Sequence, residues 1–150
     1  MRLVVQRVSR AAVQVSGRTV AEIGPGLVVL AGVGVDEDEG ESETDRLAGK
    51  LVHLRIFEDE AGKMNRSLLE AGGGILVVPQ FTLYGDVRRG RRPSWSKAAP
   101  PDIAERRIEQ LCSALETLGA TVRRGAFREH MDVELVNDGP VTIILDGSQV

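Results

Sequence analysis

A run of ten almost entirely apolar residues, from Gly26 to Val35, constrains the fold more than any other feature of this sequence. Its β-branched residues favour a strand in the centre of a sheet. Pro25 and Asp36 bound the run, which is too short to cross a bilayer as a helix. The whole chain has 150 residues, and we expect it to form a single domain, 1–150, around such a strand.

Two segments have the periodicity of helices. Ser42 begins the first with a capping-box pattern, and Asp102 is expected as the N-cap of the second, which Gly119 would end. The acid-rich run Asp36–Asp45 falls at the start of the first helix, where carboxylates complement the helix dipole. A metal site in that run is the less favoured alternative.

The remaining periodic segments predict strands. Ile75–Val78 is a short buried strand, and apolar side chains alternate over Met131–Leu135 and again over Val141–Leu145. Turn residues in Asn137–Gly139 favour a hairpin between the last two strands. The sequence therefore predicts an α+β fold, a mostly antiparallel sheet or barrel with two flanking helices.

The usual catalytic and metal-binding residue sets are missing. The single cysteine, Cys112, excludes an internal disulfide framework and falls beside the apolar stripe of the second helix, as a small core residue would. Neither His53 nor His130 has a metal-ligand partner at helical spacing, and we expect no metal and no cofactor. Because Arg2 is followed by strand-like residues and not by a signal peptide, we expect a soluble, cytoplasmic protein with no membrane partner.

Charge is segregated along the chain, although its formal net charge is only −3. The segment from Val87 to Lys97, here called the basic loop, has no acid and five basic residues: Arg88, Arg89, Arg91, Arg92 and Lys97. Arginine forks suit phosphates, and the distance in sequence from the acidic run favours a polyanionic partner over a merely solvated loop. Only five aromatic residues are available, too few for a base-stacking platform.

Two polar segments together point to a function. Gln80-Phe81-Thr82-Leu83 follows the strand predicted at Ile75–Val78, and Asn137-x-Gly139-Pro140-Val141-Thr142 stands near the end of the chain. They resemble the two signature motifs of the D-aminoacyl-tRNA deacylases (the DTD family, formerly D-tyrosyl-tRNA deacylases). The resemblance extends over the whole chain and includes four shorter segments: Val5–Val8, Arg55–Phe57, Gly62–Asn65 and Arg92–Ser94.

The resemblance implies an activity and an assembly. The reaction would be hydrolysis of the ester between a D-amino acid and the 3′-terminal adenosine of tRNA, and mischarged glycyl-tRNA would also be accepted because glycine is achiral. The implied DTD-like fold is a homodimer of barrel-like subunits whose active sites lie at the interface. The five basic residues of the loop would contact tRNA phosphates.

The resemblance also implies roles for individual residues. Gln80 and Phe81 would supply backbone N–H groups around the scissile carbonyl, and Thr82 and Thr142 would carry the motif hydroxyls. The residues implied in substrate binding are Asn137, Gly139, Pro140, Arg7 and Met64.

Most X-Pro bonds are trans, but the resemblance implies a cis bond between Gly139 and Pro140. Both carbonyls would then enter the other subunit's pocket and hold the substrate's α-ammonium group, so that an L side chain would collide with backbone. Arg7 would support this segment from the facing subunit. No base lies beside Thr142 in the sequence, which favours water activated by the 2′-OH of the terminal adenosine.

Other functions stay open on the sequence. The basic loop would suit a non-catalytic tRNA-binding module, and Thr142 or Ser94 would be the nucleophile in a hydrolase of another ester. Pro79 stands where the first motif usually has Ser, and a sister subfamily with Pro-Gln-Ala-Thr tolerates some L-substrates. A deacylase of relaxed chirality is therefore a further alternative.

Overall fold

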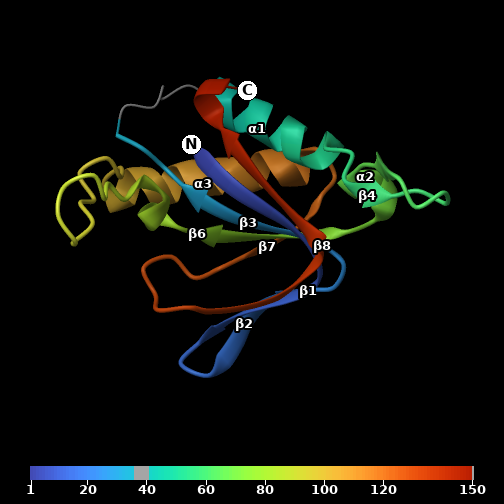
Figure 1. Ribbon diagram of the computed structural model, residues 1–150, viewed down its shortest axis with the longest axis horizontal. Helices are drawn as coiled ribbons and strands as arrows, with labels where there is room; N and C mark the ends of the chain where they lie inside the picture. Colours follow the sequence, from blue (N-terminus) through green and yellow to red (C-terminus); the bar gives the residue numbers. More distant parts are fainter. Residues whose placement is uncertain (36–40, 150) are drawn as a thin grey trace.

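The computed structural model of the chain describes residues 1–35 and 41–149. A strongly twisted sheet carries two long helices across one face (Figure 1). The strands are β1 (Arg2–Val15), β2 (Arg18–Ile23), β3 (Gly26–Gly32), β4 (Phe57–Glu58), β5 (Met64–Arg66), β6 (Gly74–Pro79), β7 (Thr121–Arg124) and β8 (Asp132–Asp146). The helices are α1 (Glu41–His53), α2 (Leu68–Ala71) and α3 (Pro101–Thr117), with 3₁₀ helices η1 (Phe81–Tyr84) and η2 (Gly147–Gln149). None of the described helices is long and apolar enough to cross a membrane.

β1 organises the main sheet. It pairs antiparallel with β2, β3 and β8, and the sheet continues from β3 to β6 and β7 through parallel pairs. β3 lies between β1 and β6 with nearly all its residues buried, which confirms the central strand predicted in the run that starts at Gly26. The predicted α+β class with a mostly antiparallel, barrel-like sheet is also confirmed.

Apolar residues form a core on each face of the sheet. Leu51 of α1 and Leu111 of α3 are fully buried against the face that the helices cover, and Leu76 and Val78 belong to a smaller core inside the curl of the sheet. Cys112 is fully buried in the larger core, and desolvation raises the pKa of its thiol to about 11. It is the small core residue that the sequence predicted.

The predicted N-cap of α3 is wrong. Pro100 holds the N-cap position without a side-chain cap, Pro101 is the first helical residue, and Asp102 lies within the first turn. Proline suits these positions because its φ is already helical and its missing N–H would have no partner there. Gly119, with φ +90°, follows the C-cap as predicted.

The beginning of α1 and the short helix α2 also differ from the prediction. α1 begins at Glu41, one residue before the cap expected at Ser42, and the acidic run over 36–40 lies outside the described residues. α2 was not expected from the sequence. Its capping box is complete, since the N–H of Ser67 donates to Glu70 at 2.7 Å and the N–H of Glu70 donates to Ser67 at 3.3 Å.

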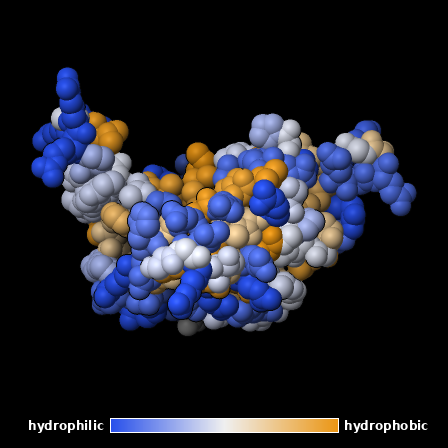
Figure 2. Space-filling view, turned by 90° about the horizontal axis from the view of Figure 1, so that it is seen from below, coloured by the Kyte–Doolittle hydropathy of each residue, from blue (hydrophilic) through white to orange (hydrophobic). Residues whose placement is uncertain are grey.

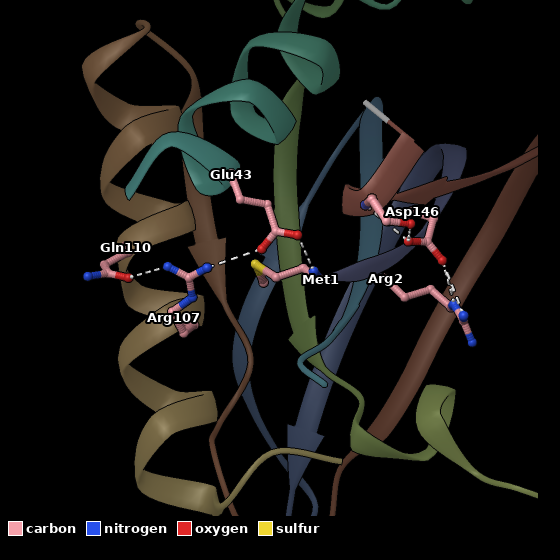
Figure 3. A network of polar contacts seen from close by, with 7 residues as sticks. Met1, Arg2, Glu43, Arg107, Gln110 and Asp146 are labelled. Atoms are coloured by element: carbon pink, nitrogen blue, oxygen red, sulfur yellow. Dashed lines mark hydrogen bonds and ion pairs between the residues drawn. The ribbon is translucent and has the colours of Figure 1, made fainter. Parts of the chain in front are cut away.

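A buried ion-pair network joins the start of β1 to both long helices (Figure 3). The amino group of Met1 donates to Oε1 of Glu43 at 2.7 Å, and Nη2 of Arg107 donates to the other carboxylate oxygen at 3.1 Å. All three residues are buried, and a Cβ on Gly147 would overlap Oε1 of Glu43. The network therefore fixes how α1, α3 and the ends of β1 and β8 sit together.

Candidate functional site

The second polar segment forms a bulge in β8, and the predicted hairpin is wrong. β8 is one strand of 15 residues that pairs with β1 on both sides of the bulge: Gln6 faces Thr142, whereas Val8 faces Asn137. Two steps along β1 thus match five steps along β8, so residues 138–141 project from the ladder. Both halves of β8 pair with β1, and the residues predicted to form a turn form the bulge instead.

Asn137 closes the bulge at its base. Its Oδ1 accepts from the N–H of Val141 at 2.8 Å, and its Nδ2 donates to the carbonyl of Val141 at 3.2 Å. At the tip, the Gly139–Pro140 bond is cis and Gly139 has φ +143°. A Cβ on Gly139 would lie 2.7 Å from Cγ2 and 2.8 Å from N of Val141, so only glycine fits without a shift.

Arg7 of β1 is 4% exposed and contacts the backbone of the bulge. Its Nε donates to the carbonyl of Asp138 at 2.9 Å, and its Nη1 donates to the carbonyl of Ile56 at 2.6 Å. Arg7 thus bonds to the bulge of its own chain, and its support of the bulge of a facing subunit stays a prediction. Met64 pairs with Glu58, whose carboxylate lies 3.8 Å from Arg7, so Met64 lies on the same side of the molecule as the bulge.

Thr142 lies at the C-terminal foot of the bulge with an exposed side chain. Its Oγ accepts from Nε2 of Gln6 and from Nδ2 of Asn137, both at 3.2 Å. Both contacts come from amides, which cannot take up the proton of the hydroxyl. This arrangement does not activate Thr142 as a nucleophile.

The first polar segment begins where β6 ends. The N–H of Gln80 donates to the carbonyl of Ala31 at 2.8 Å, and the Gln80 side chain donates to Oγ of Thr82. Because that N–H is already bonded, Gln80 cannot supply it to an oxyanion. Phe81 and Thr82 open η1, and N–H groups in a first helical turn have no carbonyl partner within the helix. The backbone N–H of Phe81 is therefore the better candidate donor.

A cavity of about 700 Å³ lies beside this segment. It is mostly apolar and is lined by β3, β6, the start of α3 and the segment before β8; its walls include Pro79, Phe81, Trp95, Phe127 and Met131. Sequence reasoning missed Phe127 and Met131, since the cavity forms only when distant segments meet. The exposed His130 also borders it. Among residues 1–35 and 41–149, no group of three His, Cys, Asp or Glu side chains is placed to hold a metal ion.

The two polar segments lie far apart within one chain. Gln80 is bonded to Ala31 of β3, whereas Arg7, under the bulge, pairs with Leu27 of the same strand. Four residues of strand span roughly 13 Å, and the three strand spacings from β8 to β6 add about 14 Å sideways. At this estimated separation, the amino group and the carbonyl of one aminoacyl ester would not both reach the two segments of a single chain.

The basic loop is a closed hairpin whose charges are not equivalent. Asp86 and Ser94 exchange backbone hydrogen bonds of 2.8 and 2.9 Å. The guanidinium of Arg88 binds the carboxylate of Asp86 and holds the pKa of that carboxyl well below its usual range. Arg88 is thus committed to its own loop, while Arg89, Arg91, Arg92 and Lys97 extend from it with exposed side chains.

An apolar row crosses the face of the sheet away from the helices. Ile144 of β8 pairs with Val4 of β1, which pairs with Leu30 of β3, and Ile144 is 68% exposed. Figure 2 shows apolar residues gathered on the body of the molecule between two largely hydrophilic projections. Thr142 points to this same face, two residues from Ile144, so the second polar segment borders exposed apolar surface.

Comparison with known proteins relates the whole chain to one family. The family model of D-Tyr-tRNA(Tyr) deacylase matches residues 4–146. A D-aminoacyl-tRNA deacylase from Heliobacterium modesticaldum is 55% identical over 98% of this chain and 97% of its own length, and one from Bacillus licheniformis is 57% identical over 97% and 98%. A solved structure of c-Myc DNA Unwinding Element Binding Protein aligns with a TM-score of 0.90 at 37% identity, covering 97% of this chain and 98% of the other.

Proposed function

The chain belongs to the D-Tyr-tRNA(Tyr) deacylase family, and on that basis we propose that it clears D-amino acids from tRNA with a chiral filter made of backbone atoms. It is a hydrolase that acts on the ester of D-aminoacyl-tRNA. The proposal rests above all on the strand register, from which we estimate that the two built polar segments lie too far apart in one chain to share a substrate. In a dimer, the bulge of each copy would lie against the first polar segment of the other copy, so that two complete sites would form.

The homodimer would form through the apolar row beside the bulge. Ile144 exposes a large side chain next to Val4, and a two-fold contact would bury both on each copy. Such a contact would bring the bulge of one copy toward Gln80 and Phe81 of the other. The exposed tip at Gly139 and Pro140 is the part available to enter a partner's pocket.

Chirality would be read by the bulge. Arg7 and Asn137 hold its backbone at both sides, so the carbonyls at Gly139 and Pro140 are fixed acceptors for the α-ammonium group of the substrate. With that group and the ester held, an L side chain would point into backbone that no rotamer change can move. Glycine has no side chain to reject, so mischarged glycyl-tRNA would be hydrolysed as well.

The chemistry would not need a side-chain nucleophile. Water would attack the ester carbonyl carbon while the N–H of Phe81 stabilises the oxyanion, and the bond to the 3′ oxygen would then break with a proton passing to that oxygen. The 2′-OH of the terminal adenosine would orient and activate the water. The apolar cavity beside Phe81 would hold the terminal nucleoside, and the exposed arginines of the basic loop would contact phosphates.

The proposed function is tested by the rates of ester loss from D-tyrosyl-tRNA and L-tyrosyl-tRNA, each against a control without enzyme. We expect rapid loss of the D-ester alone. Loss of both esters would favour a relaxed pocket, and Pro79→Ser would then be the variant to compare. If neither ester is lost while tRNA binding weakens steeply with salt, the chain is a binding module and not an enzyme.

Thr142 is expected to be dispensable for the chemical step. Thr142→Ala removes a hydroxyl that accepts two amide hydrogen bonds, each worth about 0.5–1.5 kcal/mol. If the transition state loses the equivalent of one such bond, kcat/KM should fall by about tenfold at most. A substrate ending in 2′-deoxyadenosine should instead be cleaved at least roughly 100-fold more slowly. Near-complete inactivation by Thr142→Ala in a protein of unchanged assembly would make Thr142 the nucleophile and overturn this mechanism.

A further inference from the structure

Trp95 lies across both ends of η1, the short helix that carries Phe81. Its ring meets the ring of Phe81 edge to face, with 5.2 Å between the centroids. At the other end of the helix, a Cβ on Gly85 would lie 2.8 Å from Cζ3 of Trp95, so the indole rests almost on the backbone there. The N–H of Gly85 closes η1 by donating to the carbonyl of Thr82 at 3.0 Å.

η1 meets the sheet only along one side, where Leu83 and Tyr84 lie against Gly32 of β3. None of its four residues is buried, and Phe81 itself is 55% exposed. Arg2 holds the opposite side, since its Nη1 donates to the carbonyl of Leu83 at 3.1 Å and its guanidinium lies over the ring of Tyr84. Trp95, itself 42% exposed, packs against the Phe81 side.

Trp95 also stands at the base of the basic loop. It follows Ser94, which is bonded to Asp86 across the loop, and its carbonyl accepts from the N–H of Ala98 at 2.9 Å. The carbonyl of Lys97 accepts from the N–H of Val35 at 3.1 Å and so ties this base to the residues that follow β3. Backbone hydrogen bonds therefore hold the chain on both sides of Trp95, while its indole packs against η1.

We propose that Trp95 is a positioning residue that sets the Phe81 backbone for the ester-cleavage step and couples it to the loop that contacts tRNA. This inference rests on the proposed function of Phe81. Aromatic pairs prefer defined edge-to-face geometry, so the indole fixes the start of η1 and with it the direction of the Phe81 N–H. A displacement of about 1 Å at that donor lowers the rate by roughly 100-fold.

Kinetics on two substrates separate positioning from loop binding. D-Tyrosyl-tRNA reaches the basic loop, whereas 3′-O-D-tyrosyl-adenosine has no phosphates. Trp95→Ala is expected to lower kcat for both substrates by roughly 10- to 100-fold, and Trp95→Phe to restore most of it, since phenylalanine retains an edge-to-face partner. Val87→Ala, a 68% exposed neighbour in the same loop, serves as the matched control and should leave both rates unchanged.

An increase only in KM for the tRNA, with normal kcat on the short ester, would overturn the proposal, because Trp95 would then merely hold the loop. A second measurement does not depend on activity. Trp95 is the chain's single tryptophan, so Phe81→Ala should shift its fluorescence to longer wavelength as the indole gains solvent contact. Unchanged emission would also contradict the proposal. If the wild-type protein cleaves neither substrate but Phe81→Ala still shifts the emission, the proposed function is rejected while the contact is retained.

Discussion

Replacement of Gly139 by alanine is expected to lower kcat/KM for D-tyrosyl-tRNA by roughly 100-fold or more while the chain still folds. The added Cβ would lie 2.7 and 2.8 Å from atoms of Val141 and 3.3 Å from Nη2 of Arg7, and φ +143° is unfavourable for any L side chain. The bulge must therefore shift. Because it projects from the ladder, the cost to stability should stay within about 1–3 kcal/mol. Steady-state kinetics and thermal unfolding measure the two effects separately.

A mixed dimer shows whether the affected site is shared between copies. Gly139→Ala and Phe81→Ala chains would be co-expressed and purified together through two different C-terminal tags. If each site combines Phe81 of one copy with Gly139 of the other, the mixed dimer has one intact site and one doubly altered site. Activity of about half the wild-type value is then expected, although each variant alone is impaired at both sites, Phe81→Ala because it loses the Trp95 contact that positions the Phe81 N–H. A mixed dimer as inactive as its parents would place both residues in the same chain's site and reject the exchange.

Replacement of Glu43 by alanine is expected to destabilise the fold by about 3–5 kcal/mol. Glu43 is 6% exposed, and its carboxylate lies 2.7 Å from the amino group of Met1 and 3.1 Å from Nη2 of Arg107. Its removal leaves two buried cations close together without that carboxylate. For a chain of this size the midpoint of thermal unfolding should fall by roughly 6–20 °C.

Two comparisons make the Glu43 result specific. Arg106→Ala changes an exposed cation on the same helix, one residue from Arg107, and should alter the unfolding free energy by no more than about 0.5 kcal/mol. Glu43→Ala combined with Arg107→Met removes one of the two cations and should recover part of the loss. Measurements need one protein concentration throughout, because association would raise the apparent stability. A Glu43→Ala protein that unfolds at the wild-type temperature would contradict the role of the network.

Local patterns predicted those parts of the fold that depend on neighbours in sequence. The apolar run from Gly26 predicted a central strand, and helical spacing predicted α1 and α3. The same reasoning failed at Asp102 and at Asn137–Gly139. In the first case, two prolines start α3 earlier than predicted. In the second, β1 pairs with the chain on both sides of the predicted turn, so the turn residues form a bulge within one strand.

The site divides in the same way. The two polar segments and the basic loop could be found by residue type alone, because amides, hydroxyls and arginines mark their own chemistry. The pairing of Arg7 with Asp138, 131 residues away, could not be found in this way, nor could the contact between Trp95 and Phe81 or the walls of the cavity. The assignments of individual residues to catalysis and substrate binding stay predictions until the variants are measured.

The sequence by itself determined the fold class, the two long helices and the identity of both polar segments. The helices follow from interactions within a few residues of chain, the fold class follows from the order of such segments, and the two polar segments were identified by their resemblance to family motifs. Only the tertiary structure decided that the segments stand far apart on one sheet, that Arg7 supports its own bulge and that Glu43 joins two helices to the chain's amino group. The reason is physical: strand register and burial are set by partners distant in sequence, and a one-residue shift in register would send each side chain to the other face.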